Sequence, residues 1–341
     1  MRAMLPSRAD LGARISELLR KHRADLRTRT YGNADLNPPA GPYEVVPVTT
    51  TDGAHLRVHA YGPADAETIV LVHGWTCALE YWNPQINAFA GDYRVIAYDV
   101  RGHGESDEGT APLTTDQLAD DLDAVLEATL RPGRRAVLVG HSLGGMTIQG
   151  WAGRYPERVQ QRAVAVLLSN TAASDLINHT TVVPFCNRGG LLKLPFAVGL
   201  LGLSLPVLFP PIAPVSWLFR RQIMSLDSVG DIAEFGQNIV RSCPAKVRGR
   251  FGELLSHLDV GRGAVNLTVP TSIIAGSADD MTPVVHADLI AEMLTEAGTL
   301  DGYRILPTGH LGNLEAYREF NGELARVAKS AFGIPAQVVG A

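Results

Sequence analysis

Short, continuously apolar runs alternate with helical patterns along most of this chain, and no other feature constrains the fold as strongly. The runs TIVLV (68–72), RAVLVG (135–140) and TSIIAGS (271–277) are each followed by a helical segment. A strand that is apolar on both faces must be covered on both faces, as in parallel sheets whose strands are connected by helices. The sequence therefore predicts an α/β fold with a mostly parallel sheet and helices on both faces.

Further elements continue this pattern towards both ends of the chain. Additional strands are expected at YRVIAYD (93–99), AVAVLLS (163–169) and YRILP (303–307), and further helices over 114–129, 142–155, 284–296 and 315–332. Before them, EVVPVTT (44–50) and HLRVHAY (55–61) flank a TDGA turn, which predicts an N-terminal hairpin.

The alternation stops between residues 172 and 263, which predicts a mainly helical cap inserted into the sheet domain. A chain of 341 residues suits one large domain with such an insertion. We therefore divide it into an N-terminal helical extension (1–42), a first core part (43–171), the cap (172–263) and a second core part (264–341).

The cap contains an uncharged stretch, residues 194–219, that is longer than the roughly twenty residues needed to span a bilayer. Prolines interrupt any continuous helix there, at Pro195, Pro206, Pro210, Pro211 and Pro214. A membrane span would also separate sheet strands onto opposite sides of the membrane. An apolar cap over a pocket is the better interpretation.

The N-terminal segment has no apolar core of the length found in secretory signals. Its apolar residues recur at helical spacing with arginines between them, at Leu11, Ile15, Leu18, Leu19 and Leu26. Two interpretations are open. The helix packs on the core or a partner subunit, or it rests on an anionic membrane surface as a basic amphipathic helix.

The overall composition narrows the class of protein and its location. A content of 46% hydrophobic and 19% charged residues is that of an ordinary globular protein, and the net charge of −5 gives no reason to expect nucleic-acid binding. The three cysteines (Cys77, Cys186 and Cys243) are widely spaced, which argues against a disulfide framework and against a CxxC metal or redox site. We expect a cytoplasmic protein without a metal or cofactor.

The stretch GHSLGG (140–145) directly follows an apolar strand and opens a helix. Strand, then G-x-S-x-G, then helix is the arrangement of a nucleophile elbow, in which small residues leave room for a tight turn. Gly140 and Gly144 supply that room, and Ser142 then stands at the carboxyl end of a strand, where open α/β sheets place their ligands. Ser142 is the predicted nucleophile.

Five motifs together resemble the α/β-hydrolase superfamily over about residues 43–335. They occur in the order of that family: HGW (73–75), DVRGHGES (99–106), GHSLGG (140–145), GSADDMTP (276–283) and GHLGNLE (309–315). The resemblance implies the α/β-hydrolase fold with a cap. It implies much less about the substrate, because the fold carries many activities.

The resemblance also implies a catalytic base. His310 stands in a Gly-His turn after the strand 303–307, at the family's catalytic position. His73, His103 and His141 lie inside the family's structural motifs, where we expect them to form hydrogen bonds with loops at the sheet edge. Asp99, Glu105 and Glu315 are interpreted as turn and loop-packing groups.

The acid of the triad has three candidates. The family pattern G-x-x-D-x-x-x-P runs from Gly276 to Pro283 and selects Asp279. Asp280 remains an alternative because a shift of one residue at the strand end exchanges the two. Asp175 follows another strand after which this fold sometimes keeps its acid.

A serine hydrolase also needs two N–H donors for the oxyanion that forms in acyl transfer. The residue directly after the nucleophile, Leu143, is expected to supply one backbone N–H. The resemblance assigns the other to the backbone of Trp75, which follows His73-Gly74.

The sequence therefore predicts a cofactor-independent serine hydrolase, a carboxylesterase or lipase-like enzyme acting on a small apolar ester or acyl substrate. Alternatives with the same triad are acyl transfer, lactone opening and C–C bond hydrolysis on a specialised metabolite. A non-catalytic ligand-binding relative is a further alternative, as is peripheral membrane contact through the N-terminal helix or the cap. The oligomeric state stays open.

Overall fold

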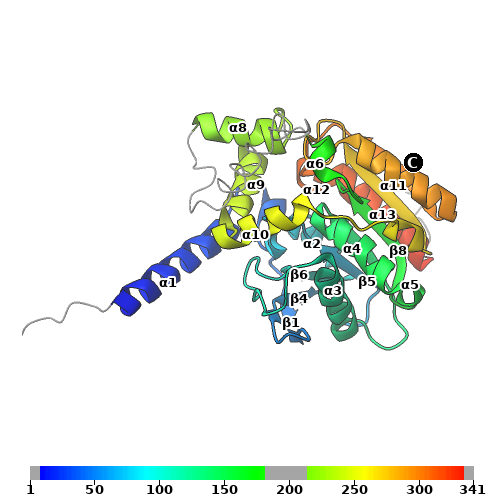
Figure 1. Cartoon of the computed structure of the whole chain (residues 1–341), viewed down its shortest axis with the longest axis horizontal. Coiled ribbons are helices and arrows are strands. Elements are labelled where there is room, and N and C mark those ends of the chain that lie inside the picture. The colour runs from blue at the N-terminus through cyan, green and yellow to red at the C-terminus, as the bar shows by residue number, and fades with distance from the viewer. Residues whose placement is uncertain (1–7, 181–212, 334–341) are drawn as a thin grey trace, which may run out of the picture.

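The computed structural model of the chain describes residues 8–180 and 213–333, which contain an eight-stranded sheet (Figure 1). Its strands run in the order β1-β4-β6-β5-β7-β8-β9-β10, and all neighbours from β6 to β10 are parallel. The strands are β1 (Tyr43–Val45), β4 (Val58–Tyr61), β5 (Thr68–Val72), β6 (Arg94–Tyr98), β7 (Ala136–His141), β8 (Ala163–Ser169), β9 (Thr271–Gly276) and β10 (Leu300–Leu306). The antiparallel pairs β1–β4 and β4–β6 form one edge.

Helices cover both faces of this sheet. The apolar side chains form two clusters, one against α3, α4 and α11 and the other against α2 and α13. Strand β5 serves both, since Val70 and Val72 face the first cluster and Ile69 and Leu71 face the second. The helices are α2 (Asn83–Phe89), α3 (Thr115–Thr129), α4 (Leu143–Arg154), α5 (Pro156–Arg162), α11 (Val284–Ala297), α12 (Gly312–Glu315) and α13 (Tyr317–Phe332). The predicted fold class is confirmed.

The N-terminal hairpin differs from the prediction of two continuous strands. Each run is divided, so that β1 pairs with β4 while β2 (Val48–Thr49) and β3 (His55–Leu56) form a separate two-stranded sheet. Pro47 lies at the break between β1 and β2 and has no N–H to donate to a ladder.

The range predicted as a cap, 172–263, contributes four helices and no strand among its described residues. These helices are α6 (Leu176–His179), α8 (Ala213–Ile223), α9 (Gly230–Ser242) and α10 (Ala245–Ser256). Most of the apolar stretch 194–219, together with Cys186, lies outside the described residues. Among the helices that the structure describes, none is both long and apolar enough to cross a membrane.

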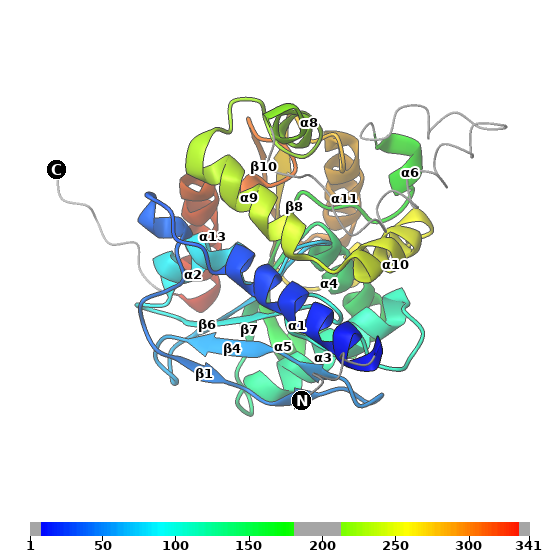
Figure 2. The ribbon, with the colours of Figure 1, turned by 90° about the vertical axis from the view of Figure 1, so that its left-hand side faces the viewer.

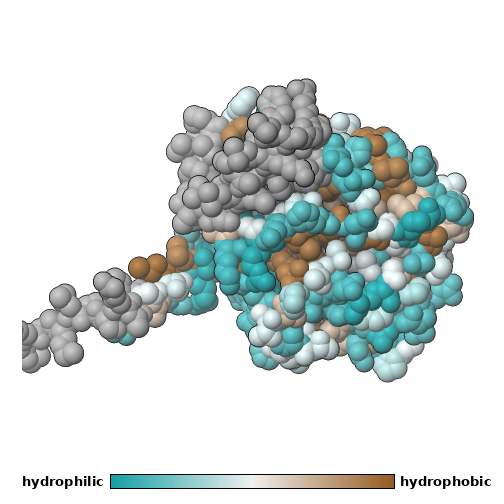
Figure 3. Space-filling model, viewed as in Figure 1, coloured by the Kyte–Doolittle hydropathy of each residue, from teal (hydrophilic) through white to brown (hydrophobic). Residues whose placement is uncertain are grey.

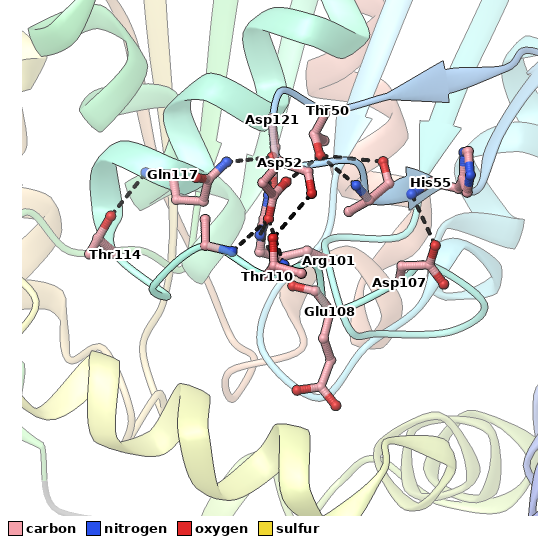
Figure 4. A network of polar contacts seen from close by, with 12 residues as sticks. Thr50, Asp52, His55, Arg101, Asp107, Glu108, Thr110, Thr114, Gln117 and Asp121 are labelled. Carbon is pink, nitrogen blue, oxygen red and sulfur yellow. Dashed lines mark hydrogen bonds and ion pairs between the residues drawn. The ribbon is translucent and has the colours of Figure 1, made fainter.

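A buried arginine ties the loop after β6 to two other elements (Figure 4). Arg101 makes a bidentate ion pair with Asp121 of α3, at 2.5 and 2.6 Å, and also bonds Asp52 in the β2–β3 turn. Its Nη1 donates to the backbone carbonyl of Glu108, whose carboxylate pairs with Lys246 and Arg250 of α10. This network fixes the motif 99–106 relative to both the sheet domain and the helical insertion.

Helix α1 (Arg8–Arg27) extends away from the body of the molecule (Figures 1 and 2). Among the described residues α1 packs against α9, and its buried side chains lie in its last turns. Leu26 and Arg27 are buried there, and Arg27 forms ion pairs with Glu80 and Glu105.

Candidate active site

Ser142 stands at the junction of β7 and α4 with a backbone conformation that side chains rarely adopt, φ 53° and ψ −120°. Its N–H donates to the carbonyl of Ser169 at the end of β8, and its carbonyl accepts from the Thr171 hydroxyl at 2.7 Å. The strained residue is therefore held from both sides. This geometry places its Oγ at the carboxyl edge of the sheet.

The glycines of the motif are required by close approach and not by their own dihedral angles. A Cβ on Gly144 would lie 2.0 Å from the Val72 carbonyl oxygen, and one on Gly140 would lie 2.7 Å from the Gly145 backbone. Neither glycine has a positive φ. The positive φ falls on Ser142 itself, as expected of an elbow.

His310 connects the serine to a carboxylate. Its Nε2 lies 2.9 Å from Ser142 Oγ, and its Nδ1 lies 2.9 Å from Asp279 Oδ2. All three side chains are nearly inaccessible to solvent. The structure thus brings Ser142, His310 and Asp279 together across 168 and 31 residues of sequence, in the arrangement of nucleophile, base and orienting acid.

Asp279 is built to stay ionised. Burial on its own raises the pKa of this carboxyl, but the charge of His310 and hydrogen bonds from His310, Asn170 and Thr282 outweigh it and lower the pKa to about 2. The donors include the Thr282 N–H at 2.9 Å and the Thr282 hydroxyl at 2.7 Å. A carboxylate so held orients the histidine without taking its proton.

The alternative acids lie elsewhere. Asp280 forms an ion pair with Arg221 of α8 at 2.9 Å. Asp175 precedes α6, is exposed, and accepts a hydrogen bond from Asn178. Of the three candidates, the structure places only Asp279 on His310.

Two polar residues that the sequence did not single out complete the support of the acid. The Asn170 amide donates to Asp279 Oδ2 at 3.0 Å and to the Gly309 carbonyl at 3.1 Å, so it joins the two loops that carry the acid and the base. Thr282 contacts both Asp279 and His310 Nδ1. Asn170 directly follows β8. Its position at the carboxyl end of a predicted strand is the sequence feature that could have indicated a place near the site.

His73, His103 and His141 form hydrogen bonds with the surrounding loops, as the sequence predicted. His73 Nε2 accepts from the Val100 N–H, His103 Nε2 accepts from the Thr76 N–H, and His141 Nε2 contacts the His310 carbonyl at 2.8 Å. Burial lowers the pKa of all three, to about 4 for His73 and about 3 for the other two. Burial therefore favours the neutral form of each ring.

The loop after β5 packs directly on the elbow. A Cβ on Gly74 would lie 2.9 Å from Ser142 Cβ, so the backbone at Gly74 runs beside Ser142. Trp75 is half-buried against the core, and its indole N–H has no hydrogen-bond partner among the described residues. Leu143 begins α4 and is buried. Of the two residues predicted to supply oxyanion donors, Leu143 directly follows Ser142, and Trp75 directly follows Gly74, which approaches Ser142.

Glu315 joins the helical insertion to the loop of His310. Its carboxylate accepts from the N–H groups of Gly309 and Leu311, on either side of His310, and from Ser225 and Ser228 between α8 and α9. The His310 N–H in turn donates to the Ile223 carbonyl at the end of α8. Burial raises the pKa of Glu315 despite these donors. Its role in loop packing thus extends to the backbone on either side of His310.

Among the described residues, no group of three His, Cys, Asp or Glu side chains is arranged to hold a metal ion. The polar groups that converge at the sheet edge are those of Ser142, His310 and Asp279 with their supporting donors. What this arrangement can do is activate a hydroxyl for attack on an electrophilic carbon.

Comparison with known proteins places this chain in a family. A family model described as alpha/beta hydrolase fold matches residues 67–178, which include the elbow. The chain is 28% identical over 280 residues to 3-oxoadipate enol-lactonase 2 of Acinetobacter baylyi, covering 82% of this chain and 95% of that one.

A second relative and a solved structure also resemble this chain over most of its length. Non-heme chloroperoxidase of Burkholderia pyrrocinia is 30% identical over 259 residues, covering 75% of this chain and 90% of the relative. A solved esterase of Exiguobacterium antarcticum, 19% identical, superposes with a TM-score of 0.67 over 84% of this chain and all of that one, which shows a shared fold. The chain belongs to the α/β-hydrolase superfamily.

Proposed function

We propose that this protein is a serine hydrolase that cleaves a carboxylic ester of an apolar substrate through an acyl-enzyme. Two contacts carry the proposal. Ser142 Oγ lies 2.9 Å from His310 Nε2, and His310 Nδ1 lies 2.9 Å from Asp279 Oδ2. A hydroxyl in contact with a histidine that is itself oriented by a carboxylate is the geometry of an activated nucleophile.

The reaction proceeds in two halves. Ser142 Oγ attacks the ester carbonyl carbon while His310 takes its proton, and the resulting oxyanion accepts from the backbone N–H groups of Leu143 and Trp75. Collapse of this intermediate breaks the C–O bond, and the alcohol leaves with the proton from His310. Water then attacks the acyl-enzyme, gives its proton to His310, and the acid leaves as Ser142 recovers its proton.

Lactone opening is a second candidate that a specific observation favours. A relative matching 82% of this chain is named an enol-lactonase. A lactone is a cyclic ester, so the same attack applies, and the alcohol stays attached to the released acid. Acyl transfer replaces water by another alcohol or an amine in the second half and needs no further residue.

The preference for an apolar substrate is inferred from the composition of the cap. The uncharged stretch 194–219 of the predicted cap is rich in leucine, proline and phenylalanine. Pockets lined mainly by such side chains bind acyl chains or rings better than charged metabolites.

A series of p-nitrophenyl esters of increasing acyl length, assayed beside simple lactones, tests this function. We expect turnover of esters, with kcat/KM rising from acetate to a longer acyl chain, and its loss in Ser142→Ala. Product analysis with and without added alcohol separates hydrolysis from acyl transfer. Unchanged turnover in Ser142→Ala rejects the proposed mechanism, and highest activity on short charged esters rejects the apolar substrate.

A further inference from the structure

Helix α1 buries side chains against the described part of the chain at its C-terminal end. At its C-terminal end Leu26 is 8% and Arg27 3% exposed, and Arg27 pairs with Glu80 at 3.5 Å and Glu105 at 3.0 Å. By contrast, every described side chain from Asp10 to His22 is exposed. The helix therefore has a fixed direction, set by its buried end, and a long portion without any cover from the described part of the chain (Figures 1 and 2).

The projecting portion carries an apolar stripe. Ile15, Leu18 and Leu19 are 49%, 66% and 48% exposed, and their spacing puts them on the helix face that buries Leu26 further along. The apolar surface is visible on the extended helix in Figure 3. Most of the stability of helices in proteins comes from packing an apolar face. This stripe is therefore suited to insertion into another apolar phase.

Basic side chains lie on both sides of the stripe. At 100° per residue, Arg14 and Lys21 flank it on one side and Arg20 and Arg23 on the other. The helix holds six basic and three acidic residues, a net charge of +3 in a chain whose net charge is −5. An apolar face bordered by cations is the pattern of a helix that lies in the interface of an anionic membrane.

The surface beside the C-terminal end of α1 is also rich in cationic side chains. Arg29, Arg220 and Arg241 line a groove of about 360 Å³ between this segment and helices α8 and α9. Glu234 pairs with Arg29, while burial and then the charge of Arg29 lower the pKa of Arg241. A phosphate group placed in this groove would offset the repulsion between these cations.

Exposed apolar side chains continue from α1 onto the insertion. Trp217 and Leu218 of α8 are 52% and 43% exposed, and Leu226 and Val229 of the following loop are 47% and 62% exposed. Figure 2 shows α1, α8 and α9 on the same side of the molecule. This side of the molecule therefore carries both apolar and cationic side chains on several elements, as contact with an extended membrane surface requires.

We propose that the protein docks on a membrane surface containing anionic phospholipid, with the stripe of Ile15, Leu18 and Leu19 in the acyl boundary and the flanking arginines and lysine on lipid phosphates. The loop between α8 and α9, which Glu315 holds against His310, then lies on the membrane side of the molecule. The docking does not depend on the proposed reaction.

Co-sedimentation of the full chain with vesicles tests this surface. The vesicles are phosphatidylcholine alone or phosphatidylcholine mixed with phosphatidylglycerol. We expect binding to the mixed vesicles that weakens with salt, and little binding to the neutral ones. Leu18→Glu with Leu19→Glu, and separately Arg14→Glu with Lys21→Glu, should each lower the affinity at least about tenfold.

The matched control is Leu289→Glu, which alters a leucine of α11, 42% exposed, on another side of the molecule (Figure 1). It should bind like the unmodified chain, and circular dichroism should show the same folded state for every variant. Equal binding to neutral and mixed vesicles, or no binding to either, overturns the proposal. A concentration-dependent dimer that Leu18→Glu with Leu19→Glu abolishes, without an effect of vesicles, assigns the stripe to a second copy and also overturns it.

Discussion

Ser142 holds a positive-φ backbone conformation that costs a residue with a side chain about 1–3 kcal/mol. The cost is met by contacts that leave the turn no alternative, namely its hydrogen bonds to Ser169 and Thr171 and the approach of Gly144 to Val72. Strain of this kind persists where the surroundings impose it. At this residue it directs the hydroxyl towards His310.

Asp279 and Asp280 provide a matched pair of substitutions at the residue scale. Asp279→Asn leaves an amide in place of the carboxylate that orients His310, so we expect kcat to fall by about 10⁴ with little change in KM. Asp280→Asn weakens the partly exposed ion pair with Arg221 and leaves the contacts of His310 with Asp279 in place, so we expect kcat to stay within about twofold. Steady-state kinetics on one ester decide the assignment. Equal losses in both variants contradict it.

Single residues were predictable from sequence where a motif fixes their place. Ser142 and His310 each lie in a short motif with its own turn, and the choice of Asp279 over Asp280 followed from the spacing to Pro283. Asn170 and Thr282 were not predictable in this way. Their importance comes from contacts with Asp279 and with the loop of His310, which no local pattern in the sequence records.

At the scale of elements, Glu315 couples the helical insertion to the loop of the base. Glu315→Gln replaces one carboxylate oxygen, an acceptor, by an NH2 group, a donor. The N–H groups of Ser225, Gly309 and Leu311, which the carboxylate now accepts from, then face a donor. We expect a loss of about 1–3 kcal/mol in unfolding free energy, and a lower kcat measured well below the unfolding temperature.

Glu319→Gln, at an exposed position on α13, is the control for this change and should leave both quantities unaltered. If Glu315→Gln loses stability while kcat is unchanged, the carboxylate only packs the loop and does not position His310. Urea unfolding and kcat on the same ester provide the two readouts.

The network around Arg101 makes a second prediction for the elements. Arg101→Met leaves the carboxylates of Asp121 and Asp52 without their main partner, and Asp121 is buried, so we expect a loss of about 3–5 kcal/mol in unfolding free energy. Arg154→Met removes ion pairs with Asp116 and Asp120 at the surface and should cost about 0–1 kcal/mol. Similar losses in both variants by urea unfolding would refute a special role for Arg101.

Elements of the sheet were predictable because a strand buried on both faces is continuously apolar. The prediction at 163–169 coincides with β8, and that at 271–277 ends within one residue of β9. The hairpin over 44–61 was predicted less well, since its division depends on how Pro47 and its neighbours meet the sheet edge. The described part of the insertion contains helices and no strand. The sequence therefore predicted that the insertion is mainly helical, but not how its helices pack.

The whole molecule should lose stability on acidification. His73, His103 and His141 have pKa values lowered by burial to about 4, 3 and 3, so between about pH 6.5 and pH 4 the unfolded chain binds protons that the folded chain does not. Each contributes about 1 kcal/mol per pH unit in that window. Asp121 and Glu315 have raised pKa values, so their protonation stabilises the folded chain on acidification. These two groups offset only part of the effect of the three histidines.

Urea unfolding from pH 7.5 to pH 4.5 measures this dependence. We expect the unfolding free energy to fall steadily below about pH 6.5. A value that is constant or rises over the same range would show that these histidines are not held neutral in the folded protein.

The central claim is that Ser142 is the nucleophile of a serine hydrolase, and covalent labelling by a fluorophosphonate tests it most directly. Mass spectrometry of the digested protein should find one adduct, on Ser142, formed in step with the loss of esterase activity. Ser142→Ala should remain unlabelled, with kcat lowered by a factor on the order of 10⁴–10⁶. Adduct formation on another residue, or an active Ser142→Ala variant, would contradict the account.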